Sequence, residues 1–276
     1  MLFRRSGDTL PAFELNLFKN LLGFTLLLPT IVVVEGLQAP DFPWPDVGIS
    51  LVSGYLGIAV ADTWYLRALH LMGASRTGIV ASLLSPFVIL LSVLFLGESL
   101  RGWQLFGFAL VMAGILLVTW RSKRRSVDAE QVRKGVFYGA GAMFLMAVGI
   151  VMVKEILETR SFVWTTEIRL AGGIGGMLAY TLLRGRVAEV RSRFAQPLPW
   201  KTITIASFLA AYVSMMMWLA GYKLIPASEA SILNESANAW IVLLAWLMLG
   251  ESLDSRKLAG LALTSSGVAV MLLVGG

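Results

Sequence analysis

The chain has 276 residues, of which 57% are hydrophobic and only 14% are charged, and its mean hydropathy is +0.75. A soluble globular domain carries about 25% charged residues, so this balance excludes an ordinary soluble fold. The net charge of +6 does not indicate nucleic-acid binding, because Lys and Arg lie in short segments between apolar stretches, where they set topology. With no Cys and one His, His70, the chain offers neither thiol chemistry nor a His-cluster metal site, and we predict no cofactor.

Nine apolar segments follow one another along the chain, each long enough to cross a bilayer as a helix. They cover residues 11–34, 46–69, 74–96, 101–121, 134–157, 163–184, 200–222, 227–249 and 255–274. Proline residues lie at or beside several boundaries, where a residue without an N–H is tolerated. The predicted fold class is therefore an all-α integral membrane protein with about nine transmembrane helices.

The chain contains an internal repeat. Residues 71–118 align with residues 224–271 at a constant offset of 153 without a gap, and LGESL occurs in both copies. Subtracting 153 places the sixth to ninth segments on the first to fourth, whereas the fifth maps ahead of Met1. We therefore predict two repeats, with four helices in residues 1–121 and five in residues 134–276, joined by a basic cytoplasmic linker at 122–133.

The two repeats are predicted to cross the membrane in opposite directions, because equivalent helices lie five segments apart and five is an odd number. Apart from Lys19, seventeen Lys and Arg residues fall on one side of the predicted membrane and five on the other. The positive-inside rule places the richer side, with Met1, in the cytoplasm and Gly276 outside. This predicts a multi-pass protein of a cell membrane of the bacterial inner-membrane type.

The doubled helical hairpin resembles the EamA-type family of the drug/metabolite transporter superfamily. The matching residues run from Ala74-Ser75 through Leu96-Gly97-Glu98 to Gly107 and Gly114, and from Ala227-Ser228 through Leu249-Gly250-Glu251 to Gly260 and Gly267. The resemblance implies ten helices in two inverted five-helix repeats, so this chain is predicted to lack the usual first helix. It also implies transport of a small solute, without naming that solute.

Few polar side chains lie near the centres of the apolar segments, where an ionisable group costs roughly 2.5 to 3.5 kcal/mol on insertion scales. The candidates for substrate or proton binding are Lys19, Asn20, Asp62, Ser85, Asn234, Glu235 and Asn238. The charges of Lys19, Asp62 and Glu235 sum to −1. We expect Lys19 to pair with one carboxylate, and the other, Glu235, to bind a proton or a cationic substrate. A cluster that only fixes helix packing is the alternative.

Several further residues have a functional and a structural interpretation. Glu14 and Glu167 are equivalent under the offset and are gate candidates near opposite membrane faces, although headgroup anchoring explains them as well. Glu98 and Glu251, in the LGE turns, are expected to begin the helix that follows each turn. Ser85-Pro86 predicts a kink. Glycines at 107, 114, 260 and 267 permit close helix contact and would suit a homodimer.

The function predicted from these features is secondary transport of a metabolite, amino acid or drug-like compound by alternating access. The sequence has no ATP-binding motif, so coupling is expected to a proton or to the gradient of the solute itself. A non-transporting membrane subunit is the first alternative. A membrane-embedded lipid-modifying enzyme is the second, and the single His with no Cys argues against it. The predicted partners are the solute and the lipid bilayer.

Overall fold

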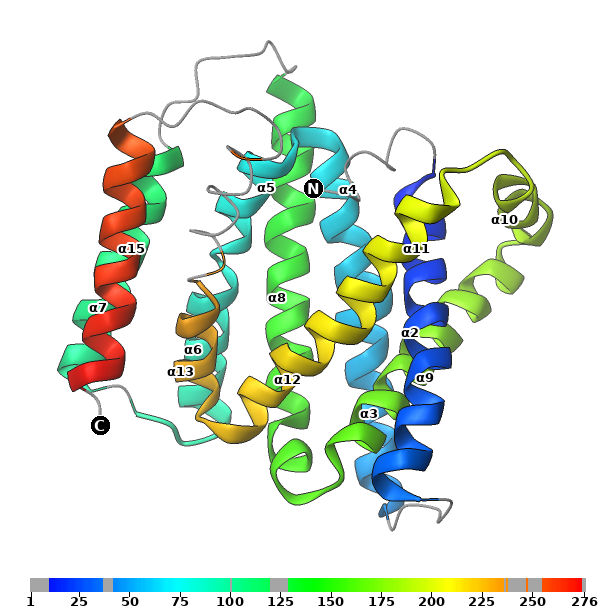
Figure 1. Ribbon diagram of the computed structural model, residues 1–276, viewed down its shortest axis with the longest axis horizontal. Coiled ribbons are helices and arrows are strands. Elements are labelled where there is room, and N and C mark those ends of the chain that lie inside the picture. The colour runs from blue at the N-terminus through cyan, green and yellow to red at the C-terminus, as the bar shows by residue number, and fades with distance from the viewer. Residues whose placement is uncertain are drawn as a thin grey trace.

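The computed structural model describes residues 10–36, 42–99, 101–119, 129–235, 237, 247 and 255–274, and the regular structure in these ranges is helical (Figure 1). Two of the segments, η1 and η2, are π-helical. The elements are α2 (Ala12–Glu35), α3 (Trp44–Gly54), η1 (Tyr55–Ala61), α4 (Asp62–Met72), α5 (Ala74–Ala81), α6 (Leu84–Phe95), α7 (Gly102–Thr119), α8 (Ala129–Thr159), α9 (Phe162–Leu183), α10 (Val187–Phe194), α11 (Trp200–Phe208), η2 (Leu209–Ser214), α12 (Met215–Leu224), α13 (Ala227–Asn234) and α15 (Ser255–Val274).

Four helical segments within the described residues are long and apolar enough to cross a membrane, namely Ala12–Glu35, Trp44–Met72, Glu130–Thr159 and Trp200–Leu224. Their apolar side chains also face outward, as at Val33, which is 84% exposed. Such outward-facing apolar residues suit a lipid environment, and the backbone polar groups in the interior of each helix bond to one another within the helix. The predicted all-helical structure is therefore confirmed for the described residues and is consistent with a membrane protein, whereas the number of nine transmembrane helices stays a prediction.

Most of the observed helices agree with the predicted segments to within a few residues. α8 differs, because it begins at Ala129, inside the segment 122–133 that was predicted to be a linker. The short helix α10 was not predicted, since its mixed composition gives no membrane-span signal. The predicted segment 227–249 is helical as α13, and beyond Glu235 almost all of it lies outside the described residues.

Elements related by the offset of 153 run in opposite directions in Figure 1. α2 descends in this view while α9 rises, and α3–η1–α4 rises while α11–η2–α12 descends. The same holds for α5–α6 against α13 and for α7 against α15. The central helix α8 contacts α4, η1, α6, α3 and α5 of the first half and α12, α9 and α13 of the second. Equivalent sequence segments therefore lie antiparallel around α8.

The two π-helical segments occupy equivalent places in the duplicated sequence. η2 spans Leu209–Ser214, and subtracting 153 gives residues 56–61, which lie within η1 at Tyr55–Ala61. A π-helical turn widens the helix by one residue per hydrogen bond, and such segments are often found at functional sites. Asp62, a predicted site residue, follows η1 directly.

A helix break also recurs at equivalent positions. α5 (Ala74–Ala81) and α13 (Ala227–Asn234) are both eight-residue helices, and they begin and end at positions 153 residues apart. In the first copy Pro86 lies in the first turn of α6, where its missing N–H costs nothing and its ring disfavours a continuous helix through Ser82. The second copy has Ala239 in place of this proline. The end of α13 at the same position therefore has a cause other than proline.

Glycines allow α2 and its equivalent α9 each to pack closely on an element of the other half, α2 on η2 and α9 on α3 and η1. On α9, a Cβ at Gly172 would lie 2.2 Å from the Leu51 carbonyl oxygen, and one at Gly176 would lie 2.2 Å from the Tyr55 ring. On α2, a Cβ at Gly23 would lie 2.9 Å from Ala211. Gly23 and Gly176 are equivalent under the offset of 153, so equivalent glycines lie at the two helix crossings.

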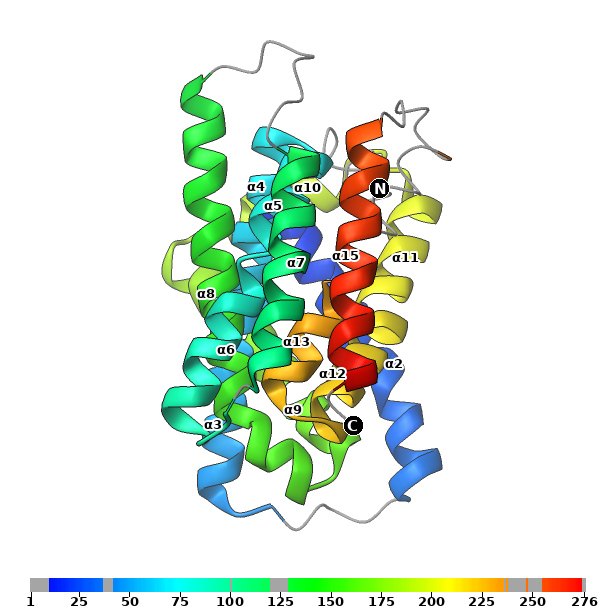
Figure 2. The ribbon, with the colours of Figure 1, turned by 90° about the vertical axis from the view of Figure 1, so that its left-hand side faces the viewer.

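The glycines of the last helices are used within the chain. α7 and α15 pack against each other, as Figure 2 shows from the side of this pair, and their glycines at 107, 114, 260 and 267 are all buried. Small residues at a contact allow two helix backbones to approach closely. These four glycines are thus explained by the α7–α15 pair, and they give no support to the homodimer that they were thought to suit.

Candidate functional site

A buried polar group joins α2 to the junction of η1 and α4. The Lys19 ammonium forms an ion pair with the Asp62 carboxylate, and their side chains are 9% and 17% exposed. Beside them, the fully buried Asn16 amide donates to the Ile58 carbonyl oxygen at 2.7 Å and to the Thr63 hydroxyl at 3.0 Å. Asn20 donates from the next turn of α2 to Asn16 Oδ1 at 3.0 Å. We call these residues, with Arg169 described next, the α2–η1 group.

Arg169 on α9 belongs to the same group, although the sequence interpretation counted it only among the five basic residues of one membrane side and not among the site candidates. Its side chain is 3% exposed, and its Nε donates to Ser53 Oγ at 3.0 Å. Ser53 Oγ in turn donates to the Gly149 carbonyl oxygen on α8 at 2.6 Å. Arg169 also lies within electrostatic range of Asp62. A buried guanidinium in a membrane bundle marks a functional group by default, and the sequence interpretation missed Arg169 as a candidate.

Including Arg169 changes the charge at the centre of the bundle. The sequence-based sum of −1 came from Lys19, Asp62 and Glu235, whereas Arg169 adds a positive charge and brings the sum to zero. Within the α2–η1 group, Lys19 and Arg169 are two cations beside one carboxylate. Each of these charges is expensive in a low-dielectric bundle unless it is paired.

Ser85 and Glu235 come together from the two halves of the chain. Ser85 Oγ, on α6, lies 2.6 Å from Glu235 Oε1 and 2.8 Å from the Ser231 carbonyl oxygen. The Ser231 carbonyl is available because the Glu235 N–H bonds to Ile232 instead, where α13 ends. Ser85 is fully buried and Glu235 is 1% exposed. The fully buried Tyr222 hydroxyl lies within electrostatic range of Glu235 and has no hydrogen-bond partner within the described residues.

The remaining candidates are distributed around these two groups. Asn20 is fully buried in the α2–η1 group, and its Oδ1 lacks a donor within the described residues. Asn234 is half-buried at the end of α13. Asn238 lies outside the described residues. The structure thus brings Lys19, Asn20 and Asp62 together on one side and Ser85 and Glu235 together between α6 and α13.

Of the two gate candidates, Glu14 lies in the first turn of α2 and Glu167 in the second turn of α9, and these two helices begin at opposite ends of the bundle (Figure 1). Glu14 is fully buried, and one of its oxygens lies 3.4 Å from the Arg186 guanidinium. Arg186 also donates to Glu189 at 2.7 Å, and this bond lowers the pKa of the Glu189 carboxyl. Glu167 is 4% exposed, and neither of its oxygens has a partner within the described residues.

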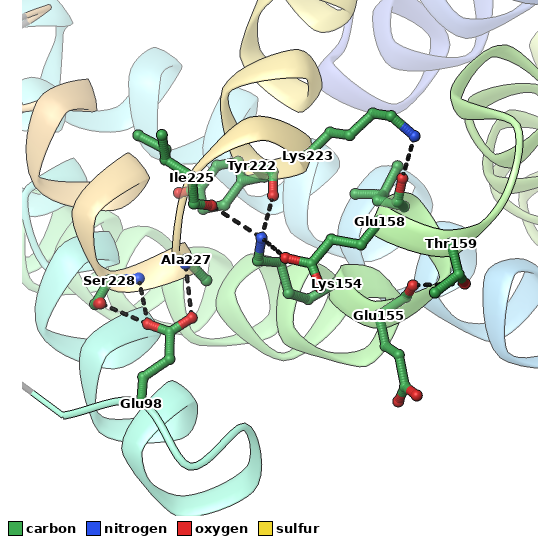
Figure 3. A network of polar contacts seen from close by, with 11 residues as sticks. Glu98, Lys154, Glu155, Glu158, Thr159, Tyr222, Lys223, Ile225, Ala227 and Ser228 are labelled. Atoms are coloured by element: carbon green, nitrogen blue, oxygen red, sulfur yellow. Dashed lines mark hydrogen bonds and ion pairs between the residues drawn. The ribbon is translucent and has the colours of Figure 1, made fainter.

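Glu98 connects the two halves at the lower end of the bundle (Figures 1 and 3). Its carboxylate accepts the backbone N–H groups of Ala227 at 2.7 Å and Ser228 at 2.9 Å, and also the Ser228 hydroxyl. Those N–H groups begin α13, where helix donors lack internal partners and the dipole attracts a negative charge. Glu98 was expected to begin the following helix, α7, and this was wrong because it caps α13 of the other half. Its counterpart Glu251 lies outside the described residues.

Two lysines beside Glu98 cap each other's helices. Lys154 on α8 is 3% exposed and donates to the carbonyl oxygens of Tyr222 at 2.6 Å and Ile225 at 2.9 Å, where α12 ends. Lys223 on α12 donates to the carbonyl oxygens of Leu157 at 2.6 Å and Arg160 at 3.2 Å, where α8 ends. Figure 3 shows this exchange. Cations at helix C-termini satisfy free carbonyls and complement the dipole, so these lysines fix α8 against α12.

An open recess of about 470 Å³ lies at this end of the bundle. Glu98 and Lys154 line it together with the exposed Glu155. The recess lies between the end of α6, the end of α8 and the connection from α12 to α13. The contacts of Glu98 therefore lie at the wall of a space that is open to solvent or headgroups.

A bundle of apolar helices that buries ionisable groups between two antiparallel halves is typical of membrane transport proteins. The family description "EamA-like transporter family" matches residues 1–120 and 133–273, which is most of the chain. The chain therefore belongs to the EamA-like transporter family, and this relationship points to a membrane transporter rather than an enzyme.

Similar proteins agree with this assignment. The chain is 25% identical over 254 residues to the uncharacterized transporter YvbV of Bacillus subtilis, covering 90% of this chain and 78% of YvbV. It is 37% identical over 87 residues to a probable terminal-alkyne amino-acid exporter of Streptantibioticus cattleyicolor, a match that spans 32% of this chain and 29% of the exporter. A protein of known crystal structure shares the fold with a TM-score of 0.75 and 20% identity, over 99% of this chain and 91% of that one.

Proposed function

We propose that this protein is a multi-pass secondary carrier of a bacterial-type inner membrane, in which two inverted repeats of four and five helices move a small solute by alternating access. The coupling ion in this proposal is a proton held by Glu235. The antiparallel arrangement of equivalent elements supports the inverted repeat. The partial likeness to an amino-acid exporter supports a solute of amino-acid size and polarity.

The contact between Ser85 and Glu235 is the observation that carries the proposal. A serine hydroxyl has one hydrogen to donate, yet Ser85 Oγ is within hydrogen-bond distance of two oxygens, 2.8 Å from Ser231 and 2.6 Å from Glu235. The backbone carbonyl has no hydrogen, so it uses the one from Ser85. A hydrogen bond between Ser85 and Glu235 then needs a hydrogen from Glu235, and the Glu235 carboxyl supplies it when it is protonated. Because Ser85 and Glu235 belong to different halves, that proton favours one relative position of the halves.

Replacing Glu235 by glutamine should separate proton coupling from transport. Glutamine retains a neutral, hydrogen-bonding side chain, so Glu235→Gln is expected to keep the counterflow of a labelled L-amino acid mixture in proteoliposomes. It is expected to lose at least about 90% of the solute-driven acidification or alkalinisation of vesicles loaded with the dye pyranine, because the carried proton is gone. Glu155→Gln, at an exposed carboxylate, is the matched control and should retain both activities.

The outcomes of this experiment discriminate among the alternatives. If Glu235→Gln retains the full pH dependence and only lowers the yield of folded protein, then Glu235 is a structural residue and the coupling proposal fails. If the wild-type protein shows no counterflow with any of the twenty L-amino acids or with a panel of organic acids and amines, a non-transporting subunit is the better interpretation. Chemical conversion of the reconstituted lipid would indicate a membrane-embedded lipid-modifying enzyme.

Closure of one face of the carrier is assigned to Glu98. Its carboxylate holds the first turn of α13 against the turn after α6, and the side chain of Gln104 on α7 donates to Glu229 in the same turn at 2.8 Å. In the predicted orientation this end of the bundle faces outward. A charged cap on a helix N-terminus contributes about 0.5 to 2 kcal/mol, which is enough to bias two states but small enough to break in each cycle.

Removal of this cap should make the interior accessible to a water-soluble reagent. Because the chain has no cysteine, Ala230→Cys, a buried position one turn inside α13, gives a single labelling site. We expect Glu98→Ala in this background to raise the rate of labelling by an impermeant maleimide about five- to thirty-fold, the fold-change that about 1 to 2 kcal/mol implies. Glu155→Ala, in the same recess, should leave the rate unchanged.

A second variant keeps this test decisive if Glu98→Ala folds poorly. Glu98→Gln keeps an acceptor oxygen but loses the charge, so its labelling rate should lie between those of the wild type and the alanine variant. Equal rates for the wild type and both Glu98 variants, in protein that elutes as a single species on gel filtration, would show that Glu98 does not hold this face closed.

A further inference from the structure

The guanidinium of Arg169 is held rigidly while much of its hydrogen-bonding capacity is unused. Its backbone is fixed by the close crossing of α9 and α3, and its Nε is oriented by Ser53, which is itself anchored on α8. An arginine has five N–H donors in a planar fork. Its Nη1 has no partner within the described residues, although the side chain is 3% exposed. The arginine is therefore preorganised toward a partner that the described protein groups do not supply.

The carboxylate of Asp62, which interacts electrostatically with Arg169, already forms an ion pair with another residue. Asp62 forms its ion pair with Lys19, so that its charge is shared between two cations. Glu167, two residues before Arg169, makes no hydrogen bond to it, because neither Glu167 oxygen has a partner within the described residues. A buried cation without its own counter-ion is costly. The α2–η1 group thus has one positive charge in excess of its ion pair.

The surroundings of Arg169 include a glycine beside its guanidinium, and the α2–η1 group offers a second point of attachment. At Gly57 of η1 there is no side chain, and an added Cβ would lie 3.6 Å from Arg169 Nη2. The next residue, Ile58, receives the hydrogen bond from Asn16, which in turn accepts from Asn20. The Asn20 Oδ1 atom is an acceptor without a donor. The α2–η1 group therefore holds both unused donors, on Arg169, and an unused acceptor, on Asn20.

We propose that Arg169 binds a carboxylate of the transported solute, with Asn20 Oδ1 accepting a hydrogen bond from a donor on the same solute. This inference rests on the proposed transport function and names the class of its substrate. The planar fork of arginine fits the two oxygens of a carboxylate, and hydrogen bonds to charged groups are the strong ones. The bound carboxylate supplies the counter-ion that Arg169 lacks, so that solute binding neutralises the group.

The test measures ligand binding by thermal unfolding of the purified full chain, followed by the fluorescence of its 9 Trp residues. The probes are the twenty L-amino acids, acetate and propionate, each compared with its amide, which lacks the negative charge. At least one acid is expected to raise the Tm of the wild type when its amide does not. Arg169→Gln should weaken binding of that acid about 10- to 100-fold, and Arg169→Lys, which keeps the charge but loses the fork, by less.

A purely structural arginine would behave differently. If Arg169 only held helices together, Arg169→Gln would lower the Tm of the ligand-free protein, whereas a ligand site predicts an unchanged or higher Tm because an uncompensated charge is removed. Stabilisation of the wild type by amides or amines alone, by no compound at all, or equally in Arg169→Gln would overturn the proposal. Acid binding through Arg169 with no counterflow of that acid would instead refute the proposed transport.

Discussion

Asp62→Asn is expected to destabilise the protein by about 3 to 5 kcal/mol, one of the largest effects of any single substitution in this chain. The reason is electrostatic, because Asp62 is the carboxylate that accompanies both Lys19 and Arg169 in a buried group. Breaking a buried pair by removing one partner leaves the other charge without compensation. The measurement is thermal or denaturant unfolding in detergent micelles, together with the yield of monodisperse protein.

A second ion pair of the same chain provides the control. Arg160 Nε lies 3.0 Å from Asp46, at side chains that are 34% and 23% exposed. Pairs that are accessible to solvent contribute about 0 to 1 kcal/mol, so Asp46→Asn should change stability several-fold less than Asp62→Asn. Equal effects of the two substitutions would show that Asp62 does not compensate buried cations.

The coupling between Lys19 and Asp62 can be measured directly. If the loss in Asp62→Asn comes from the uncompensated ammonium, then the double variant Lys19→Met with Asp62→Asn should recover a large part of it. A double-mutant cycle should give an interaction energy of about 1 to 3 kcal/mol. Strictly additive effects would mean that the ion pair contributes nothing beyond its two side chains.

The sequence predicted that Lys19 would pair with a carboxylate, but it did not identify Arg169 as a further member of this buried group. Lys19 was expected to pair with a carboxylate because charges near a bilayer centre need compensation, and the pair with Asp62 follows from that physical rule. Arg169 was counted only among the basic residues of one membrane side, because it lies near the start of its helix and the sequence does not show how deeply its side chain is buried. Its burial results from the close crossing of α9 with α3, a contact between residues more than a hundred positions apart.

The contacts of Glu98 could be foreseen only in part. A glutamate in a tight turn before an apolar stretch indicates a helix N-terminus, and Glu98 does cap one. Which helix it caps depends on the packing of the two halves, and Ala227 and Ser228 are 129 and 130 residues away. Asn16 was missed for a similar reason, although its spacing of four from Asn20 places both on one face of α2.

The fold was more accessible to prediction than the site. Segment length and hydropathy place the helices because the bilayer imposes both. The π-helical segments η1 and η2 have no such signature, since residues 55–61 are as apolar as an ordinary helix. The break at Ala81 carried a signal in Pro86, whereas the equivalent end of α13 at Asn234 did not. Deviations inside a span are set by packing, which a single apolar pattern does not encode.

Gly54→Ala should have the other large effect, a loss of about 3 kcal/mol or more of stability. A Cβ at Gly54 would lie 1.8 Å from the backbone carbonyl oxygen of Arg169, far inside contact distance. A backbone oxygen cannot rotate away as a side chain can, so α3 and α9 must separate along the crossing. Overpacking costs about 1 to 3 kcal/mol even where side chains can adjust, and here they cannot.

Gly48→Ala is the matched control, because Gly48 lies on the same helix and nothing is within 4 Å of its added Cβ. There alanine should be neutral or stabilising by up to about 1 kcal/mol, the gain in helix propensity over glycine. Gly54→Ala should in addition weaken acid binding, since it displaces the backbone that carries the Arg169 guanidinium away from Ser53. Equal stability of the two alanine variants would mean that α3 and α9 are not in this close contact, and the orientation of Arg169 would then have to come from somewhere else.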